Sequence, residues 1–260
     1  MAYETIKVEI ADRRATLTLN RPESANTLNL LMMQELADCF EFLKDNPEVQ
    51  ILVIKGEGKV FSAGGDIKMM LTSADPVDFE IVMGYLSRMM LAFYQLSMVT
   101  IAQIHGAAAG LGFSIALGCD VIVAEEKSKL AMNFIGVGLV PDGGGHFFMK
   151  ERVGVPKAKQ MIWQGSIMEP SEALEAGLID YIAEENEVEA MVDQLVGKFL
   201  SSPILAVLET KAILHSQKIS ELQNVLKLEA EAQKRMRKTE DHLEGIKAFI
   251  EKRTQQFKGK

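Results

Sequence analysis

The feature that most constrains this chain is a pair of short apolar runs, each followed at once by a glycine-rich loop. Residues 51–54 lead into the loop 56–65, and residues 99–104 lead into the loop 105–110. Both runs contain β-branched residues and are short, which favours buried strands over buried helices. In α/β proteins the carboxyl ends of such strands are where ligands tend to bind. The pattern therefore predicts an α/β fold with a ligand site at these two loops.

Weaker signals around the loops extend the pattern into a strand-strand-helix rhythm. Residues 4–10 and 14–19 alternate apolar and polar positions, which predicts an antiparallel hairpin. A helix is expected over about 28–45, where apolar residues recur at helical spacing after a cap at Asn26 or Thr27. The other expected elements are a helix over about 76–96, a helix that ends near 118 and a strand over 120–124.

After about residue 186 the strand signals stop, and the chain reads as successive amphipathic helices, one of them started by Pro203. We place a boundary near residue 200. Residues 1–200 are expected to form the core that binds the ligand, and residues 201–260 a helical region that covers the site and supports oligomerisation. The alternating charges from residue 227 onward fit a solvated helix face or a subunit contact about equally well.

The composition excludes several classes of protein. With 260 residues, of which 48% are hydrophobic, the chain can bury a large core. A formal net charge of −8 disfavours nucleic acid and anionic membranes as partners, because both favour a basic face. Cys39 and Cys119 lie in apolar surroundings, so neither a disulfide framework nor a cysteine metal site is expected. The first residues lack the basic start and apolar run of a signal peptide, and a cytoplasmic location is expected.

One stretch imitates a membrane span. From Val99 to Cys119 the only residue that could carry a formal charge is His105. Gln103, His105 and four glycines interrupt this stretch, and it has no basic flank. A buried strand, a glycine loop and a buried helix explain it better than a membrane span.

The two glycine loops can offer backbone N–H groups to a ligand. The segments 61–68 (FSAGGDIK) and 105–113 (HGAAAGLGF) each join an expected strand to an expected helix. Glycines allow an N–H group to point outward, and the first N–H groups of a helix have no partner within it. Two such amides that face one point would form an oxyanion site. Either loop by itself is more often a tight packing turn than a site.

Taken together, the two loops, their order and their spacing resemble the crotonase (enoyl-CoA hydratase/isomerase) superfamily over nearly the whole chain. The resemblance implies a spiral of strand-strand-helix units with a helical C-terminal region, assembled as a homotrimer or homohexamer. It also implies an acyl-CoA substrate, no cofactor beyond the coenzyme A of that thioester, and no metal. The matching segments are residues 19–22 with Asn26, the loop 61–67, residues 105–120, residues 138–144 (GLVPDGG) and residues 172–178.

The family's binding positions carry over residue by residue. The thioester carbonyl oxygen would accept hydrogen bonds from the N–H groups of Gly65 and Leu111. Lys68 would lie near the phosphates of coenzyme A, unless it is an ordinary exposed helix lysine. The adenine and pantetheine channel would be lined, largely by backbone atoms, by Ser24, Ala25, Ala63, Asp66 and Ile67.

The catalytic carboxylates of the family's hydratases have no counterpart here. Those enzymes are expected to hold glutamates at the positions that Ser114 and Phe134 occupy in this chain. Hydration needs carboxylates that hold and deprotonate a water, and neither side chain can do this. One acid remains well placed, because Asp142 lies at the turn where the single-acid enoyl-CoA isomerases and epoxide isomerases of the family hold their Glu or Asp. The sequence therefore favours an isomerase that moves a double bond with one base through an enolate.

Asp142 could instead cap a helix, which would lower its pKa, whereas a dry pocket would raise it. His105 is predicted to be structural, His146 to be a surface or packing residue, and Asp120 to be a conformational anchor. Four further functions stay open for a chain of this pattern. They are an epoxide or dienoyl-CoA isomerase, a weak hydratase with a water on Ser114, an acyl-CoA hydrolase and a non-catalytic CoA-binding protein.

Overall fold

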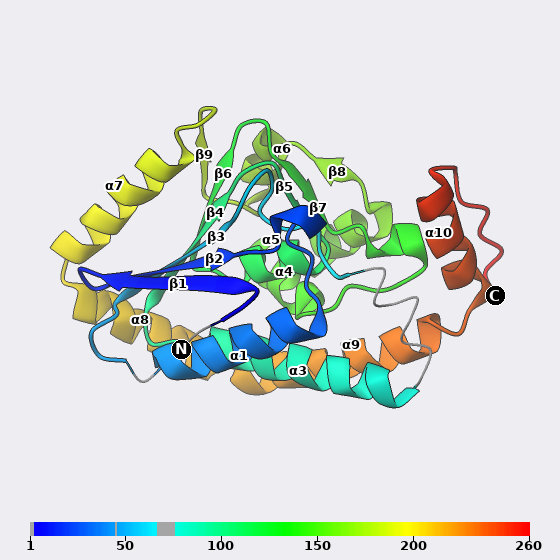
Figure 1. Cartoon of the computed structure of the whole chain (residues 1–260), viewed down its shortest axis with the longest axis horizontal. Coiled ribbons are helices and arrows are strands. Elements are labelled where there is room, and N and C mark those ends of the chain that lie inside the picture. The colour runs from blue at the N-terminus through cyan, green and yellow to red at the C-terminus, as the bar shows by residue number, and fades with distance from the viewer. Residues whose placement is uncertain (1–2, 45, 67–75) are drawn as a thin grey trace.

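The computed structural model describes residues 3–44, 46–66 and 76–260, and these residues are built around a six-stranded sheet (Figure 1). The strand order is β1-β2-β3-β4-β6-β9. β1 runs antiparallel to β2, and the remaining pairs in this sheet are parallel. A second, three-stranded sheet has the order β5-β7-β8. The strands are β1 Ile6–Ala11, β2 Arg14–Leu19, β3 Ile51–Gly56, β4 Val99–Ile104, β5 Ala107–Ala109, β6 Val121–Glu125, β7 Lys129–Ala131, β8 Ile167–Met168 and β9 Tyr181–Ala183.

Helices cover both faces of the large sheet. In Figure 1, α1, α3 and α9 lie side by side on one side of it, and α7 lies on the opposite side against β4, β6 and β9. The helices are η1 Pro22–Ser24, α1 Leu30–Lys44, α3 Pro76–Tyr94, α4 Leu111–Leu117, η2 Phe134–Val137, α5 Gly145–Gln164, α6 Pro170–Ala176, α7 Val188–Ser201, α8 Ile204–Ser216, α9 Ile219–Met236 and α10 Glu240–Glu251.

The central strands are buried on both faces, which explains their uninterrupted apolar runs. Alternate residues of β3 point in opposite directions, as in any strand. Ile51 and Val53 pack in a cluster with Val192 of α7. Leu52 and Ile54 belong to the larger core that includes residues of α1 and α3. The two expected strands 51–54 and 99–104 are thus confirmed as β3 and β4, at the centre of the fold.

The N-terminal hairpin is also confirmed. β1 and β2 pair in register, with Ala11 opposite Arg14. Between them, Asp12 and Arg13 have φ angles of 49° and 65°. Two consecutive left-handed residues give a turn whose twist matches that of the strands, so this short connection closes the hairpin.

The predicted cap of the first helix, at position 26 or 27, is wrong. α1 starts directly after Asn29, whose Oδ1 accepts a hydrogen bond from the Met32 N–H at 2.9 Å. Asn26 lies in the interior instead, and its side chain donates to the carbonyl oxygens of Glu57 and Val60 at 2.8 and 2.9 Å. It therefore ties the segment before α1 to the loop after β3 rather than capping a helix.

The two glycine loops are hydrogen-bonded to each other. The Phe61 N–H donates to the His105 carbonyl at 2.9 Å. The Ser62 N–H donates to the Ala107 carbonyl, and the Ala109 N–H donates back to the Ser62 carbonyl, both at 3.0 Å. These bonds extend the pairing of β3 and β4 beyond the ends of the strands. The loops therefore form one backbone unit, and α4 starts from it.

After residue 200 the chain forms the helices α8, α9 and α10, as predicted, and residues 252–260 follow α10 without helix or strand. α9 packs against α3 and α5, so this region contacts the core directly. The boundary near residue 200 stays a prediction. The uncharged stretch 99–119 forms β4, β5 and α4. Within the described residues no single helix meets the length and hydropathy expected of a membrane span; α7 and α8 do so only as a pair, and they are bent by 99°.

Replacing Asn26 with Ala is expected to lower the free energy of unfolding by about 2–3 kcal/mol, because two buried carbonyl groups lose their donor. Urea denaturation measures this as a lower midpoint with an unchanged slope. The exposed Gln194 of α7 provides the control, since its replacement by Ala should change stability by less than about 0.5 kcal/mol. Equal effects of the two substitutions would show that Asn26 does not hold the loop.

Candidate active site

Asp142 is a buried acid with one oxygen left unpaired. It follows Pro141 in the turn before α5, and the residue is 6% exposed. Its Oδ2 accepts a hydrogen bond from Nε2 of Gln233 at 3.2 Å. Its Oδ1 is buried and has no hydrogen-bond partner among the described residues. A buried, unpaired carboxyl oxygen is costly to the fold, so its presence calls for a functional explanation.

The carboxyl group of Asp142 borders a partly enclosed cavity of about 40 Å³, which has room for a few water molecules. Among the described residues, Asp142 is the only carboxylic acid that lines it. Arg237 also reaches the cavity, and its guanidinium group lies over the Phe79 ring at 4.8 Å. The lining residues are Met33, Gly65, Phe79, Val82, Met83, Leu86, Leu111, Phe134, Leu139, Asp142, Gln233 and Arg237.

The two predicted oxyanion donors, Gly65 and Leu111, border this same cavity. Leu111 is the first residue of α4, so its N–H has no partner within the helix. Gly65 forms a bridge to Leu28, and the two bonds of that bridge use the Leu28 N–H and the Asp66 N–H. Within the described part of the chain, neither the Gly65 nor the Leu111 N–H donates a hydrogen bond to the backbone or to a side chain. Both amides are therefore available to a ligand.

A glycine allows the two loops to come this close. Gly64 has a φ of 99°, a conformation that side chains disfavour. A Cβ at this position would lie 2.7 Å from the Ala109 carbonyl oxygen and 3.5 Å from the Leu111 nitrogen. Any larger residue would push the first loop away from the start of α4 and separate the two amides.

The residues at the two hydratase positions do not offer a second acid. Ser114 is fully buried, and its Oγ donates to the backbone carbonyl of Asp142 at 2.8 Å. It thus holds the turn that carries the acid. Phe134 lines the cavity and contributes apolar surface next to Asp142. Neither residue adds a second acid, because Ser114 fixes the turn and Phe134 adds apolar surface.

The interpretation of Asp142 as a helix cap is wrong. The N-cap of α5 is Gly144, two residues further on, because Gly143 and Gly144 adopt φ angles of 63° and 78°. The first amides of α5 are bonded instead by Glu229 of α9, which accepts from the N–H groups of Gly144 at 2.8 Å and His146 at 3.0 Å. Released from capping, Asp142 has a pKa raised well above its ordinary value, mainly through burial and secondarily through the negative charge of Glu229.

Sequence reasoning missed the contribution of α9. Glu229 and Gln233 lie one turn apart, on the face that also carries the buried Leu222 and Leu226. The signal in the sequence was that Glu229 and Gln233 stand where the helical spacing of Leu222 and Leu226 predicts apolar residues. His146 is half-exposed, in agreement with the prediction of a surface or packing residue, and its Nδ1 lies 2.8 Å from Oε1 of Glu229.

The residues predicted to bind coenzyme A lie partly together. The Ala63 N–H donates to the Ala25 carbonyl at 3.0 Å. The Arg21 guanidinium lies 3.2 Å from Asp66 and 3.5 Å from the Ser24 hydroxyl. Ser24, Ala25, Ala63 and Asp66 are thus linked by hydrogen bonds beside the first loop, and their binding roles stay predictions. Ile67 and Lys68 lie outside the described residues.

Two further residues take structural positions. His105 Nε2 lies 2.9 Å from the Gly58 carbonyl, beneath the first loop. Asp120 accepts hydrogen bonds from the N–H and hydroxyl of Thr100 at 2.7 and 2.9 Å, and from Lys211 at 2.7 Å. These contacts agree with the predicted anchoring role of Asp120. Among the described residues, no group of three or more His, Cys, Asp or Glu side chains is placed to hold a metal ion.

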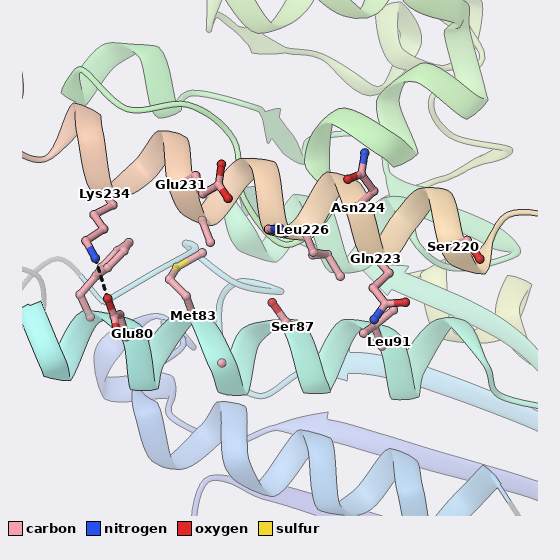
Figure 2. Close-up of a pocket in the computed structure, with 14 residues that line it drawn as sticks. Glu80, Met83, Ser87, Leu91, Ser220, Gln223, Asn224, Leu226, Glu231 and Lys234 are labelled. Carbon is pink, nitrogen blue, oxygen red and sulfur yellow. Dashed lines mark hydrogen bonds and ion pairs between the residues drawn. The ribbon is translucent and has the colours of Figure 1, made fainter.

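A larger groove lies next to the small cavity, between α3 and α9. Figure 2 shows the side chains that line it, with Glu80 and Lys234 paired across it at 2.6 Å. Its volume is about 660 Å³. Phe79 and Met83 line both the groove and the cavity beside Asp142, so these two side chains separate the two spaces.

Comparisons with known proteins agree with this geometry. The family model described as Enoyl-CoA hydratase/isomerase matches residues 9–260. The chain is 48% identical over 243 residues to the enoyl-CoA hydratase/isomerase YhaR of Bacillus subtilis, covering 94% of each protein. It is 30% identical over 263 residues to the trans-2-decenoyl-[acyl-carrier-protein] isomerase of Streptococcus mutans, covering 100% of both. The crystal structure of an enoyl-CoA hydratase from Mycobacterium avium subsp. paratuberculosis superimposes with a TM-score of 0.89 at 32% identity, covering 99% of this chain and 100% of that one.

Replacing Asp142 with Asn is expected to raise thermal stability near neutral pH. Because the pKa of Asp142 is raised in the folded state, the folded protein binds more protons than the unfolded chain between the ordinary carboxyl pKa and the raised one. Wild-type stability therefore falls as pH rises through that window, whereas the amide variant carries no charge to bury. Melting temperatures measured from about pH 4 to pH 8 should diverge in favour of the variant as pH rises.

A difference in melting temperature that does not change with pH would contradict the buried-acid interpretation. The matched control is Glu209→Gln, which removes an exposed carboxylate from α8 and should leave the pH dependence of stability unchanged.

Proposed function

Because this chain belongs to the enoyl-CoA hydratase/isomerase family, we propose that it is an isomerase that converts 3-enoyl thioesters into 2-enoyl thioesters with Asp142 as its single base. The observation that carries this proposal is the unpaired, buried Oδ1 of Asp142 in a cavity that two available backbone amides also border. The arrangement supplies one group that moves a proton and two donors for a developing negative charge. Among the described residues, no second carboxylate lines the cavity.

The reaction balances with these groups alone. Asp142 takes a proton from the carbon next to the thioester carbonyl, and the electron pair spreads over the oxygen and the former double bond as a dienolate. The amides of Gly65 and Leu111 stabilise the negative oxygen. The protonated Asp142 then returns the same proton two carbons further along, which leaves the double bond conjugated to the carbonyl. A raised carboxyl pKa suits this cycle, because the group must both accept and release a proton.

Hydration is less well supported by the site than isomerisation. A hydratase must hold and activate a water molecule, and the positions expected to do so carry Ser114, which is bonded to the Asp142 carbonyl, and the apolar Phe134. The names of the relatives include both isomerases and hydratases, so the proposed reaction rests on the geometry of the site.

The thioester carrier that we propose is coenzyme A, with the residues beside the first loop, including Ala25 and Ala63, along its path. The Streptococcus mutans relative is named for an acyl-carrier-protein substrate, so both carriers belong in an activity screen. We also propose that the protein works in the cytoplasm as a homotrimer or homohexamer, as the family resemblance implies.

The acyl chain needs more space than the cavity beside Asp142 offers. The groove between α3 and α9 is about 660 Å³, against about 40 Å³ for the cavity, and among the described residues Phe79 and Met83 are the two that line both. We propose that the tail of a long acyl chain passes these two side chains and lies in the groove, among residues such as Leu91 and Leu226 (Figure 2).

Asp142→Asn is expected to reduce kcat for a 3-enoyl-CoA by about 10²–10⁴-fold, because the variant has no base, while CoA binding is unchanged. Turnover is followed by the absorbance of the conjugated product, and binding by calorimetry. The wild-type reaction in heavy-oxygen water should leave no label in the product. Labelled product, or full activity in the variant, would rule out the proposed isomerase.

Gly84→Trp is expected to discriminate between chain lengths. Gly84 lines the groove, and an added Cβ there has no heavy atom within 4 Å, so an indole can fill the groove without displacing the core. The KM for a decenoyl thioester should rise about tenfold or more, since several buried methylene groups lose their contacts, while turnover of a butenoyl thioester should not change.

Gly84→Ala serves as the control for this substitution. It adds one methyl group in open space and should leave both substrates unaffected. If Gly84→Trp slows both chain lengths equally, the groove does not hold the acyl tail.

A further inference from the structure

Two buried polar side chains of α9 reach the turn that carries Asp142. Glu229 is 3% exposed and Gln233 is 2% exposed. They follow the buried Leu222 and Leu226 at helical spacing, where apolar residues would complete the stripe. Burying an amide and a carboxylate at such positions costs free energy unless each is fully bonded. The hydrogen bonds of Glu229 and Gln233 to the turn that carries Asp142 offset this free energy.

Gln233 fixes one oxygen of the acid. Its Nε2 donates to the Val140 carbonyl at 2.6 Å and to Oδ2 of Asp142 at 3.2 Å. Both partners are acceptors, so the amide nitrogen, rather than the amide oxygen, must face them. The bond to Val140 anchors the amide to the backbone two residues before the acid. Consequently Oδ2 is occupied by a donor, and Oδ1 is the oxygen left to move a proton.

Glu229 fixes the other side of the turn. Its Oε2 accepts from the Gly144 N–H at 2.8 Å, and its Oε1 accepts from the His146 N–H at 3.0 Å and lies 2.8 Å from His146 Nδ1. α5 has no side-chain cap of its own, so this distant carboxylate takes the place of one. The start of a helix favours a negative charge, so a carboxylate suits this place at the N-terminus of α5.

Among the described residues, the charged groups around the acid come from α5 and from α9 with its C-terminal cap. Glu229 and Arg237 belong to α9 and its C-terminal cap, and the half-exposed His146, which pairs with Glu229, belongs to α5. The described residues that α1 and α3 contribute to the cavity are apolar: Met33, Phe79, Val82, Met83 and Leu86. Among the charged groups, Glu229 is the one whose negative charge acts on Asp142 to raise its pKa, after burial itself.

We propose that Glu229 and Gln233 are positioning residues for the isomerase reaction. Gln233 bonds Oδ2 of Asp142 and so leaves Oδ1 as the oxygen that moves the proton. Glu229 fixes the turn and holds a negative charge beside the acid. This inference rests on the proposed function, since it assigns to α9 the setting of the base used there. It makes the C-terminal region part of the catalytic apparatus rather than only a cover.

The two residues have opposite effects on the acid, and this gives a sharp test. Gln233→Leu removes a donor that favours the charged carboxylate, so the acidic limb of the pH–rate profile should move to higher pH. Glu229→Gln removes a like charge, so the same limb should move to lower pH. For Gln233→Leu, kcat should fall by up to about 100-fold with little change in KM, because the base loses its orientation.

The controls separate positioning from general damage. Glu229→Asp keeps the charge and should leave the limb where it is in the wild type, even if the shorter side chain lowers stability. Glu209→Gln, on the exposed surface of α8, should change neither the limb nor kcat. Circular dichroism confirms that each variant is folded before it is assayed.

A second measurement makes the result independent of turnover. Titration of the Asp142 carboxyl carbon by NMR in the ligand-free protein should show the same two opposite shifts. Titrations that move in one direction, or not at all, would overturn the positioning roles of Glu229 and Gln233. If the two variants show opposite shifts but the wild-type protein isomerises no enoyl thioester, the proposed function and the catalytic part of this inference are overturned instead.

Discussion

The hydrogen bonds that join the two glycine loops are the interaction on which the rest of the site depends. The Ser62 N–H and carbonyl bond to the loop after β4, so the pairing of two parallel strands continues past their ends. Without this continuation, Gly65 and the first residue of α4 would be carried by independent loops. With it, two amides from separate strand-helix connections border one cavity, and the sheet fixes their spacing. The rigidity needed to stabilise a developing negative charge therefore comes from main-chain bonds and does not depend on flexible side chains.

Main-chain bonds position the two amides, whereas Asp142 is held by side chains from distant parts of the sequence. Ser114 bonds the Asp142 carbonyl, Gln233 bonds one carboxyl oxygen, and Glu229 bonds the amides that follow. The fold accepts an unpaired carboxyl oxygen in an apolar cavity, which costs stability and raises the pKa of Asp142. The proposed site therefore combines a pair of amide donors positioned by backbone geometry with a proposed base whose pKa is set by the residues around it.

Local sequence signals were sufficient for β1 to β4 and β6, the main helices and the family, but not for the shortest strands or for the contacts that complete the site. The runs 51–54 and 99–104 were recognisable because a doubly buried strand needs a continuous apolar sequence. The cap of α1 was misplaced because Asn26, Thr27 and Asn29 are all plausible caps, and the interior bonds of Asn26 join residues more than 30 positions apart. The strands β5, β7 and β8 have only two or three residues, too few to show any periodicity. Asp142 was identified from its place in a motif, whereas its partner Gln233 lies 91 positions away, and no local rule connects them.

The bonds from α9 to the turn at 142–146 also determine when the site becomes complete during synthesis. Translation proceeds from the N-terminus, and domains generally fold as units as they emerge. The sheet strands β1 to β6, both glycine loops and Asp142 itself lie before residue 150, but the amides of Gly144 and His146 and the Oδ2 of Asp142 receive their partners only from residues 229 and 233. On the proposed function, a growing chain whose Gly65 and Leu111 amides are already in place would still lack an oriented base until α9 leaves the ribosome and docks.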